Sequence, residues 1–436
     1  MKSQFLIAAP SSNSGKTTIT LGLLRLLHHR GFKVQPFKCG PDYIDTKHHT
    51  LAAKKKSINL DTFMMSPNYV ADTYINYSYK ADISIVEGVM GLFDGANRMQ
   101  GSSAEIAMLL DLPVILVINA KSMAYSAAPI LYGFKYFNPK VKIAGVIFNF
   151  VNTESHYQFL KDACEDIGIE SLGYIPANDA IKIPSRHLGL AISDDNDYDA
   201  IIEQVASHIG QFVNIDRLLE LSLMPEKAFK PKQIKSNQGK KIKIAIAQDQ
   251  AFNFTYFENI EALKKIGELT FFSPIHDVFL PETDLLYLAG GYPELYLNEL
   301  TANNSMRASI LDYCNQGGKV IAECGGMMYL GKSIVDKEGN SYSMAGFLEI
   351  ETSMQNAKLS LGYRTIFLND TLLKGHEFHY STFKELDILC KVGEVKNAKG
   401  VLVDTPIYKK NKVLASYIHF YWGENVLLLD LLKGFS

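Results

Sequence analysis

Residues 5–24 read Phe5-Leu-Ile-Ala-Ala-Pro-Ser-Ser-Asn-Ser-Gly-Lys-Thr-Thr-Ile-Thr-Leu-Gly-Leu-Leu. The apolar run at 5–9 predicts a buried strand, and the apolar residues at helical spacing from Ile19 to Leu27 predict a helix that Gly31 ends. The small and polar residues between them form a loop. The stretch therefore predicts a strand, a loop and a helix in direct succession.

This loop has the composition of a phosphate-binding site. Its backbone N–H groups and the positive end of the following helix can face phosphate oxygens, while a lysine adds a full charge and a threonine reaches Mg²⁺. The strict pattern G-x-x-x-x-G-K-[ST] asks for glycine where this chain has Pro10, which has no N–H to donate. We expect a nucleoside triphosphate to bind at Ser12, Asn13, Ser14, Gly15, Lys16, Thr17 and Thr18.

Length and composition predict a globular protein of several domains. The chain has 436 residues, more than one ordinary domain, and 47% of them are hydrophobic. Its net charge of −2 gives no reason to expect a nucleic-acid partner or a membrane surface. No signal-peptide core and no membrane-length apolar run occurs, so we expect a cytoplasmic protein. Five scattered cysteines without a C-x-x-C pair argue against disulfide scaffolds and zinc sites.

Two further stretches place carboxylates at strand ends. A strand at 33–37 leads into Lys38-Cys-Gly-Pro-Asp-Tyr-Ile-Asp, where Asp42 and Asp45 either hold a hydrated Mg²⁺ and orient a substrate or only cap the next helix. A buried strand at 83–86 is followed by Glu87 and Gly88. An acid in that place is typical of the metal-side carboxylate of phosphate-loop enzymes.

Strands continue to alternate with helices up to residue 175. Apolar strands at 114–119, 143–149 and 172–175 are separated by helical segments at 126–137 and 156–167, which predicts a mostly parallel α/β sheet covered on both faces. Asn149 and Asn152, just past a strand, either recognise a base edge or are turn residues. Arg186 and His187 lie in a loop that either faces an anion or has no such role.

A change of composition marks the domain boundary. Residues 224–241 contain two prolines and six lysines with almost no apolar periodicity, so they predict a linker between a first domain at 1–223 and a second at 242–436. The second domain begins a new α/β pattern with the strand at 242–247, and continues through Leu285-Leu-Tyr-Leu-Ala-Gly-Gly-Tyr-Pro-Glu.

The sequence Val320-Ile-Ala-Glu-Cys-Gly-Gly predicts a nucleophile elbow with sulfur in place of the serine oxygen. A strand ends before Cys324, and a helix begins at Gly325. The sharp turn exposes the side chain, and the helix N-terminus favours the thiolate. The alternative is a cysteine buried in the core.

The histidine that serves as base must lie far from Cys324 in sequence. The candidates are His376, His379 and His419, and we choose His419 because it follows a short apolar strand near the C-terminus, in the order nucleophile then base. Backbone N–H groups for an oxyanion are expected from a pair of glycines after a predicted strand and from the residue after the nucleophile. These residues are Gly290, Gly291 and Gly325.

With both halves in view, the chain resembles the cobyrinic acid a,c-diamide synthase family of corrin-ring amidotransferases over nearly its full length. The resemblance rests on six motifs in order: Ala9-Pro-Ser-Ser-Asn-Ser-Gly-Lys-Thr-Thr, Phe37-Lys-Cys-Gly-Pro-Asp-Tyr-Ile-Asp, Val86-Glu-Gly-Val-Met-Gly-Leu-Phe-Asp-Gly, Ala289-Gly-Gly-Tyr-Pro-Glu, Ala322-Glu-Cys-Gly-Gly-Met-Met-Tyr-Leu and Gly375-His-Glu-Phe-His-Tyr-Ser. The Ala-Pro opening also occurs within that family.

The resemblance implies an N-terminal P-loop domain similar to dethiobiotin synthetase and a C-terminal class I glutamine amidotransferase domain. Cys324 and His419 would release ammonia from glutamine, and ATP with Mg²⁺ would phosphorylate a carboxylate of cobyrinate before amination. By position, Asp45 and Glu87 would be catalytic, and Thr17, Asp42 and Glu87 would hold the metal. Class I enzymes usually carry a glutamate two residues after the histidine; this chain has Tyr421 there, and Glu424 is the substitute unless a dyad suffices.

Other functions fit part of the same pattern. A sister enzyme amidating nickel-sirohydrochlorin or hydrogenobyrinate would share every motif. A nucleotide-switch ATPase would usually carry a second lysine before the loop, which is missing between Phe5 and Ser14, and would need no elbow cysteine. An amidotransferase acting on a protein or cell-wall lipid would need membrane or partner features that the sequence lacks. A homodimer is compatible with the sequence.

Overall fold

The computed structural model describes residues 1–178, 181, 197–226, 241–368 and 371–424. The chain divides into two compact units, Met1–Lys232 and Gln233–Ser436. The dividing point lies within the stretch 224–241 that the sequence predicts as a linker. Residues 227–240 of that stretch, and the predicted anion-facing loop with Arg186 and His187, lie outside the described residues.

The first unit alternates strands and helices from its N-terminus. Its strands are β1 (Lys2–Ala8), β2 (Val34–Cys39), β3 (Ile58–Leu60), β4 (Ile83–Glu87), β5 (Val114–Asn119), β6 (Ile143–Asn149), β7 (Glu170–Ile175) and β8 (Leu223–Met224). Its helices are α1 (Lys16–His29), α2 (Asp45–Ala53), α3 (Pro67–Ser78), α4 (Ser103–Leu110), α5 (Ala127–Tyr136), α6 (Glu154–Ile167), α7 (Tyr198–Phe212) and α8 (Ile215–Leu221).

These strands form one sheet in the order β3-β2-β4-β1-β5-β6-β7, and every neighbouring pair in that order is parallel. Strand β8 pairs antiparallel with β1, so the first unit includes Leu223 and Met224. The order changes direction around β1, which places the loops after β1, β2 and β4 together at the carboxyl edge of the sheet, where open α/β sheets bind ligands.

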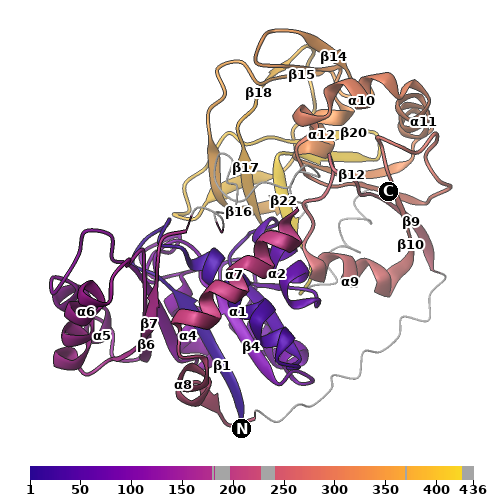
Figure 1. Cartoon of the computed structure of the whole chain (residues 1–436). Helices are drawn as coiled ribbons and strands as arrows, with labels where there is room; N and C mark the ends of the chain where they lie inside the picture. The colour runs from indigo at the N-terminus through magenta and orange to yellow at the C-terminus, as the bar shows by residue number, and fades with distance from the viewer. Residues whose placement is uncertain (179–180, 182–196, 227–240, 369–370, 425–436) are drawn as a thin grey trace. The chain divides into compact units, whose positions relative to one another are not determined.

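The sheet of the first unit is buried on both faces. Every residue of β2 and β4 is buried, as parallel sheets covered by crossover helices require. Helices α1, α2 and α7 lie side by side on one face, where α1 and α7 pack onto Phe5 and Ile7 of β1 (Figure 1). Helix starts are fixed locally: Ser102 and Thr153 accept the N–H groups of Glu105 and His156.

The second unit contains three sheets and short helices. Its strands are β9 (Ile242–Ala247), β10 (Gly267–Phe272), β11 (Leu285–Leu288), β12 (Lys319–Glu323), β13 (Ser333–Val335), β14 (Ser341–Ser343), β15 (Ile350–Ser353), β16 (Ser360–Leu368), β17 (Thr371–His379), β18 (Thr382–Glu385), β19 (Glu394–Asn397), β20 (Ile407–Lys410), β21 (Val413–Ser416) and β22 (Ile418–Tyr421). Its helices are α9 (Phe257–Ile266), the 3₁₀ turn η2 (Pro293–Leu295), α10 (Leu297–Ala302), α11 (Asn304–Asn315) and α12 (Gly325–Leu330).

The central sheet of the second unit has the order β10-β9-β11-β12-β21-β20, parallel except for the edge strand β20. A second sheet has the order β14-β13-β15-β18, and a third, antiparallel one the order β19-β16-β17-β22. Only Tyr417 separates β21 from β22, so the chain passes there from the central sheet to the third. This corner brings β22 beside the end of β12.

Candidate active sites

The phosphate loop of the first unit joins β1 to α1. Gly15 precedes the helix with φ +94°, a left-handed conformation that favours glycine, and a Cβ at this position would lie 2.1 Å from Nδ2 of Asn149. That same Nδ2 donates to the carbonyl of Ser14 at 3.0 Å, and the Ser14 hydroxyl donates to Ser11 O at 3.0 Å. The loop is thus held from inside and from the end of β6.

Lys16 lies folded back over the loop. Its Nζ donates to Met90 O at 2.7 Å and to Ser11 O at 3.3 Å, and its side chain is buried. Burial lowers the pKa of Lys16 to about 8, with Glu87 acting in the opposite direction. A phosphate at the loop would raise this pKa again, because an anion favours the protonated form of the ammonium group.

A cluster of charged side chains lies directly beyond the loop. Thr17 Oγ1 donates to Glu87 Oε1 at 2.6 Å, and the fully buried Lys38 Nζ lies 2.9 Å from the same oxygen and 2.6 Å from Asp45 Oδ2. The residues come from the ends of α1, β2, α2 and β4. A cation and two carboxylates are thus held within hydrogen-bond distance at the carboxyl edge of the sheet.

Glu87 is ionised within this cluster. Burial disfavours its charge, but Lys38 and His49 outweigh burial and hold the pKa of Glu87 below its usual range. His49 Nε2 lies 2.6 Å from Glu87 Oε2, and its Nδ1 lies 3.2 Å from Ser57 Oγ. For Lys38, Asp45 and Glu87 together overcome burial and hold its pKa well above the ordinary value.

Asp42 has a different position from Asp45. Its Oδ1 accepts the backbone N–H groups of Ile44 and Asp45 at 2.9 and 2.8 Å, and its Oδ2 is 4.0 Å from Lys38 Nζ. These bonds form a turn directly ahead of α2, whose N-cap is Ile44, and burial next to Asp45 raises the pKa of Asp42 to about 7. Asp45 approaches Thr17 at 3.4 Å and is the closer aspartate for a shared ion.

The oxygen atoms of Thr17, Asp45 and Glu87 are of the kind that Mg²⁺ prefers. Within the part of the chain that the structure describes, no group of three or more histidine, cysteine, aspartate or glutamate side chains has a metal-binding arrangement.

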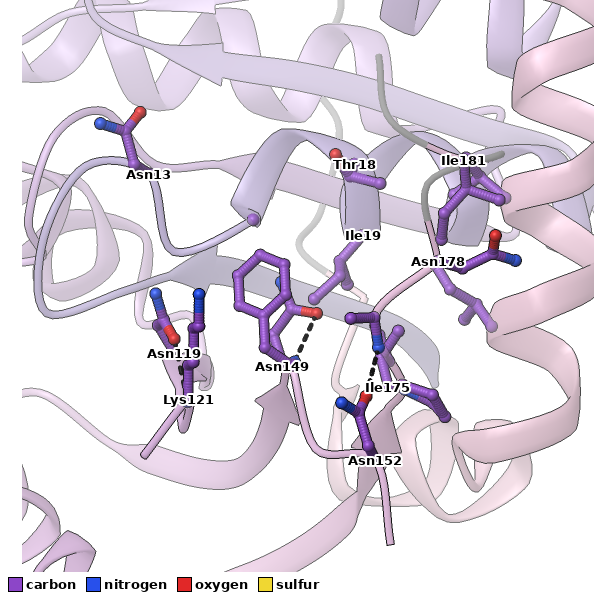
Figure 2. Close-up of a pocket in the computed structure, with 16 residues that line it drawn as sticks. Asn13, Thr18, Ile19, Asn119, Lys121, Asn149, Asn152, Ile175, Asn178 and Ile181 are labelled. Atoms are coloured by element: carbon purple, nitrogen blue, oxygen red, sulfur yellow. Dashed lines mark hydrogen bonds between the residues drawn. The ribbon is translucent and has the colours of Figure 1, made fainter. Parts of the chain in front are cut away.

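A cavity of about 580 Å³ opens beside the phosphate loop (Figure 2). Its polar wall contains Asn13, Asn119, Lys121, Asn149, Asn152 and Asn178, and Ile19, Ile175 and Ile181 supply apolar surface. Asn149 borders this cavity, and its Nδ2 donates one hydrogen bond to the carbonyl of Ser14. Asn152 Oδ1 accepts the N–H of Ala177. The two predicted base-reading residues thus lie in one pocket, where each also fixes the local backbone.

In the second unit, Cys324 occupies the sharp turn between β12 and α12. Its φ of +46° and ψ of −109° lie outside the ordinary regions, the strained geometry expected of a nucleophile elbow. Its N–H donates to Ser416 O at 2.8 Å, and its Sγ lies 3.7 Å from the carbonyl of Phe378 in β17. The strand–turn–helix predicted from the sequence is therefore present.

His419 follows the short buried strand β21, as predicted, and itself lies within β22, opposite His376 of β17. A Cβ on Gly290 would come 2.1 Å from its Cε1, so the imidazole rests against the backbone of that glycine. A Cβ on Gly325 would lie 3.1 Å from the nitrogen of Gly291. Gly290 therefore lies against His419, and Gly291 lies beside Gly325, the residue after Cys324; the oxyanion site at these three glycines stays a prediction.

Burial disfavours the charged forms of both the nucleophile and the chosen base. Burial raises the pKa of the Cys324 thiol, with Glu294 adding to the effect, and burial lowers the pKa of His419 to about 3. The start of α12 acts as expected, because the N–H of Gly325 lowers the pKa of Cys324, but burial outweighs this effect and raises that pKa overall. A neutral imidazole can accept the thiol proton when the sulfur attacks.

The residue two positions after His419 is Tyr421, which has no carboxylate. Its ring packs edge-on against the ring of Tyr256. Glu424 lies beyond the end of β22, and its part as a substitute stays a prediction. Glu377 of β17 is engaged elsewhere: its oxygens accept from Arg364 Nε at 2.7 Å and lie 2.9 Å from His379 Nε2.

Comparison with known proteins gives the family. The model of the CobQ/CobB/MinD/ParA nucleotide binding domain matches residues 5–190, and that of the CobB/CobQ-like glutamine amidotransferase domain matches residues 243–426. A cobyrinate a,c-diamide synthase of Streptococcus sanguinis is 40% identical over 99% of both chains, and that of Picrophilus torridus is 40% identical over 96% of both. The chain belongs to the cobyrinate a,c-diamide synthase family. It is therefore an amidating ligase with a nucleotide-binding domain and a glutamine amidotransferase domain.

Membership of the cobyrinate a,c-diamide synthase family agrees with both halves of the predicted fold. A crystal structure of a glutamine amidotransferase covers 44% of this chain and 97% of its own, at 16% identity and a TM-score of 0.31, a likeness too weak to carry any part of the assignment. Among the helices that the structure describes, none has the length and hydrophobicity to cross a bilayer.

Several residues that the structure places in these sites had no role predicted from the sequence. Lys38 and His49 contact Glu87. The sequence signal for Lys38 was its place in the Phe37-Lys-Cys-Gly-Pro-Asp stretch, and that for His49 was its place in the helix that follows. Glu294, half-buried in η2, acts electrostatically on Cys324, and burial raises its pKa to about 7. Its signal was the Tyr-Pro-Glu sequence after the paired glycines.

Proposed function

We propose that the protein uses ATP and glutamine to convert the a and c side-chain carboxylates of cobyrinate into amides. The observation that carries the proposal is the presence of two sites in one chain: a phosphate loop facing Asp45 and Glu87, and an elbow cysteine followed by Gly325, which lies against Gly291, the neighbour of the glycine that contacts His419. The first suits phosphoryl transfer and the second suits acyl transfer from an amide. The substrate follows the names of relatives similar over nearly the whole chain.

The amidotransferase half begins with glutamine bound beside Cys324. The sulfur attacks the carboxamide carbon while His419 accepts the thiol proton, and the N–H groups of Gly291 and Gly325 face the developing oxyanion. The tetrahedral adduct collapses to a glutamyl thioester, His419 returns the proton to the leaving nitrogen, and ammonia departs. Water then hydrolyses the thioester to glutamate and restores the thiol.

The synthetase half must make a carboxylate reactive. A carboxylate resists attack by ammonia because its leaving group would be oxide, so the γ-phosphoryl group of ATP is first transferred to it. Lys16 and the loop N–H groups hold the phosphates, and Lys38 offsets the negative charge near Glu87. Ammonia then attacks the acyl phosphate and phosphate leaves, giving amide, ADP and phosphate.

A magnesium ion fits the oxygen atoms of Thr17, Asp45 and Glu87 and would neutralise charge on the β- and γ-phosphates. This set differs from the predicted one in using Asp45 in place of Asp42. The cavity with Asn149 and Asn152 is the place we assign to the nucleoside.

Mass spectrometry tests the proposal. Cobyrinate, hydrogenobyrinate and nickel-sirohydrochlorin are incubated in parallel with the full-length protein, MgATP and glutamine. Each amidation exchanges a carboxyl hydroxyl for an amino group, so two successive products are expected from cobyrinate. Two steps on another macrocycle instead would keep the mechanism and replace the substrate, and no change on any of them would overturn the proposal.

A further inference from the structure

Strand β22, which carries His419, has no neighbouring strand on one edge, and side chains make the hydrogen bonds there. Strand β22 ends its sheet and pairs with β17 on the other edge. On its outer edge, the N–H of Phe420 donates to Glu323 Oε1 at 3.0 Å, and Phe420 O accepts from Asn259 Nδ2 at 2.8 Å. The N–H of Trp422 donates to Asn259 Oδ1 at 2.9 Å. Two buried polar side chains thus take the place of a neighbouring backbone.

One of these side chains also connects the nucleophile with the base. Glu323 immediately precedes Cys324, and its backbone partner Phe420 immediately follows His419. The other oxygen of Glu323 accepts from the hydroxyl of Tyr287 in β11 at 2.8 Å. Because all these groups are buried, the carboxyl has no freedom to exchange its partners for water.

We propose that Glu323, assisted by Asn259, is a positioning residue that fixes His419 relative to Cys324 through the backbone of Phe420. The inference rests on the proposed Cys324–His419 pair. In a triad, an acid beside the imidazole fixes the orientation of the ring. Glu323 would provide the same fixed orientation without contacting the ring. The outer edge of β22 presents both backbone N–H donors and a backbone carbonyl acceptor. It therefore needs one side chain that accepts, Glu323, and one that can also donate, Asn259.

Neither nearby glutamate can act as an ordinary triad acid. Both oxygens of Glu323 are taken by Phe420 and Tyr287, and those of Glu377 by groups that include Arg364 and His379. Burial raises the pKa of Glu323 to about 8, and the hydrogen bonds from Tyr287 and Phe420 act in the opposite direction. A carboxamide in its place keeps an oxygen that accepts from Phe420, and its amide hydrogens can be donated to the oxygen of Tyr287.

The test compares two substitutions in the full-length protein. Glu323→Gln keeps an acceptor for Phe420 and should change the kcat of glutamine hydrolysis by less than about threefold. Glu323→Leu has a similar volume but no acceptor, and should lower that kcat by about 10- to 100-fold, the effect of a misplaced catalytic group, with the KM for glutamine little changed. Amidation with added ammonium should persist in both. Tyr408→Phe, which removes a hydrogen bond to Glu385 elsewhere in the same unit, is the matched control.

A double-variant cycle separates positioning from a general structural role. If Glu323 acts through His419, then Glu323→Leu should add no further loss of glutamine hydrolysis in a His419→Ala background. An additive loss, or a full glutaminase rate in Glu323→Leu, would overturn the inference. So would a Glu323→Gln variant as impaired as Glu323→Leu, because that would require the charge. A His419→Ala protein that hydrolyses glutamine at the unmodified protein's rate would instead overturn the proposed pair.

Should Glu323→Leu fail to fold, Asn259→Asp replaces it. This variant keeps the acceptor for Trp422 and loses the donor to Phe420 O, so it loosens the same strand from the other side. Slower glutamine hydrolysis with unchanged ammonium-dependent amidation supports the inference, and an unchanged glutaminase rate overturns it.

Discussion

Gly290 leaves no room for a side chain against His419. A Cβ added to this glycine would lie 2.1 Å from Cε1 of the imidazole and 2.7 Å from its Nδ1, far inside van der Waals contact. Gly290 of the Ala-Gly-Gly-Tyr motif is therefore needed for two reasons. A side chain there would collide with the histidine, and the glycine keeps its own backbone accessible. The contact joins the end of β11 to β22, two elements more than a hundred residues apart.

We expect Gly290→Ala to move the imidazole and to lower glutamine hydrolysis by about 100-fold, since small displacements of catalytic groups have effects of that size. Amidation driven by added ammonium should remain, because the first unit is untouched. Initial rates with the two nitrogen sources measure this directly. Gly133→Ala, where nothing lies within 4 Å of the added Cβ, is the control. Full glutaminase activity in Gly290→Ala would mean that His419 is not the base.

Cys324→Ala should abolish glutamine-dependent amidation and spare the ammonium-dependent reaction, because only glutamine hydrolysis needs a sulfur nucleophile. The two rates are measured on the same preparation with saturating MgATP. Cys390→Ala, at an exposed cysteine of the same unit, should change neither. Loss of both reactions in Cys324→Ala would show that this cysteine is structural, contrary to the strain of its backbone.

Short-range patterns in the sequence predicted those parts of both sites that lie within one turn of the chain. The phosphate loop and the Cys324 elbow are each a strand, a turn and a helix start, so apolar periodicity and glycine placement define them before any tertiary contact. The same holds for Glu87, which ends a buried strand. Gly290 and Gly291 were found for a similar reason, since a glycine pair after a strand indicates backbone that must come close to something else.

What the sequence did not predict depends on contacts between distant segments. Lys38 and Glu87 are 49 positions apart, and only the adjacent, parallel arrangement of β2 and β4 brings their side chains together. Periodicity shows that both strands are buried but not that they are neighbours. The effect of the helix start on the pKa of Cys324 could be predicted from the sequence, whereas the burial that outweighs it could not.

Lys38→Met should remove both stability and ligase activity. Taking away the cation leaves Asp45 and Glu87 buried without it, and breaking a buried pair in this way costs about 3–5 kcal/mol. We expect a lower urea midpoint and no amide formation from glutamine or ammonium, with glutamine hydrolysis retained at temperatures where the protein is folded. Lys142→Met, which breaks an exposed pair with Asp111, should be nearly neutral. A stable, active Lys38→Met protein would contradict the role of the cluster.

The pH dependence of glutamine hydrolysis should lack the acid limb of an ordinary histidine. Burial, with His376 and His379 adding to it, lowers the pKa of His419 to about 3, so the imidazole stays neutral and able to accept a proton as the pH falls below 6.5. We expect kcat/KM to change less than about twofold between pH 7.5 and 5.5, whereas a base with a pKa of 6.5 would lose about tenfold. Glu294→Gln is the control, because burial raises the pKa of that carboxyl to about 7 and its titration falls in the same range. A tenfold acid limb that persists in Glu294→Gln would show that His419 is solvated when glutamine binds, and that the buried arrangement is not the one that reacts.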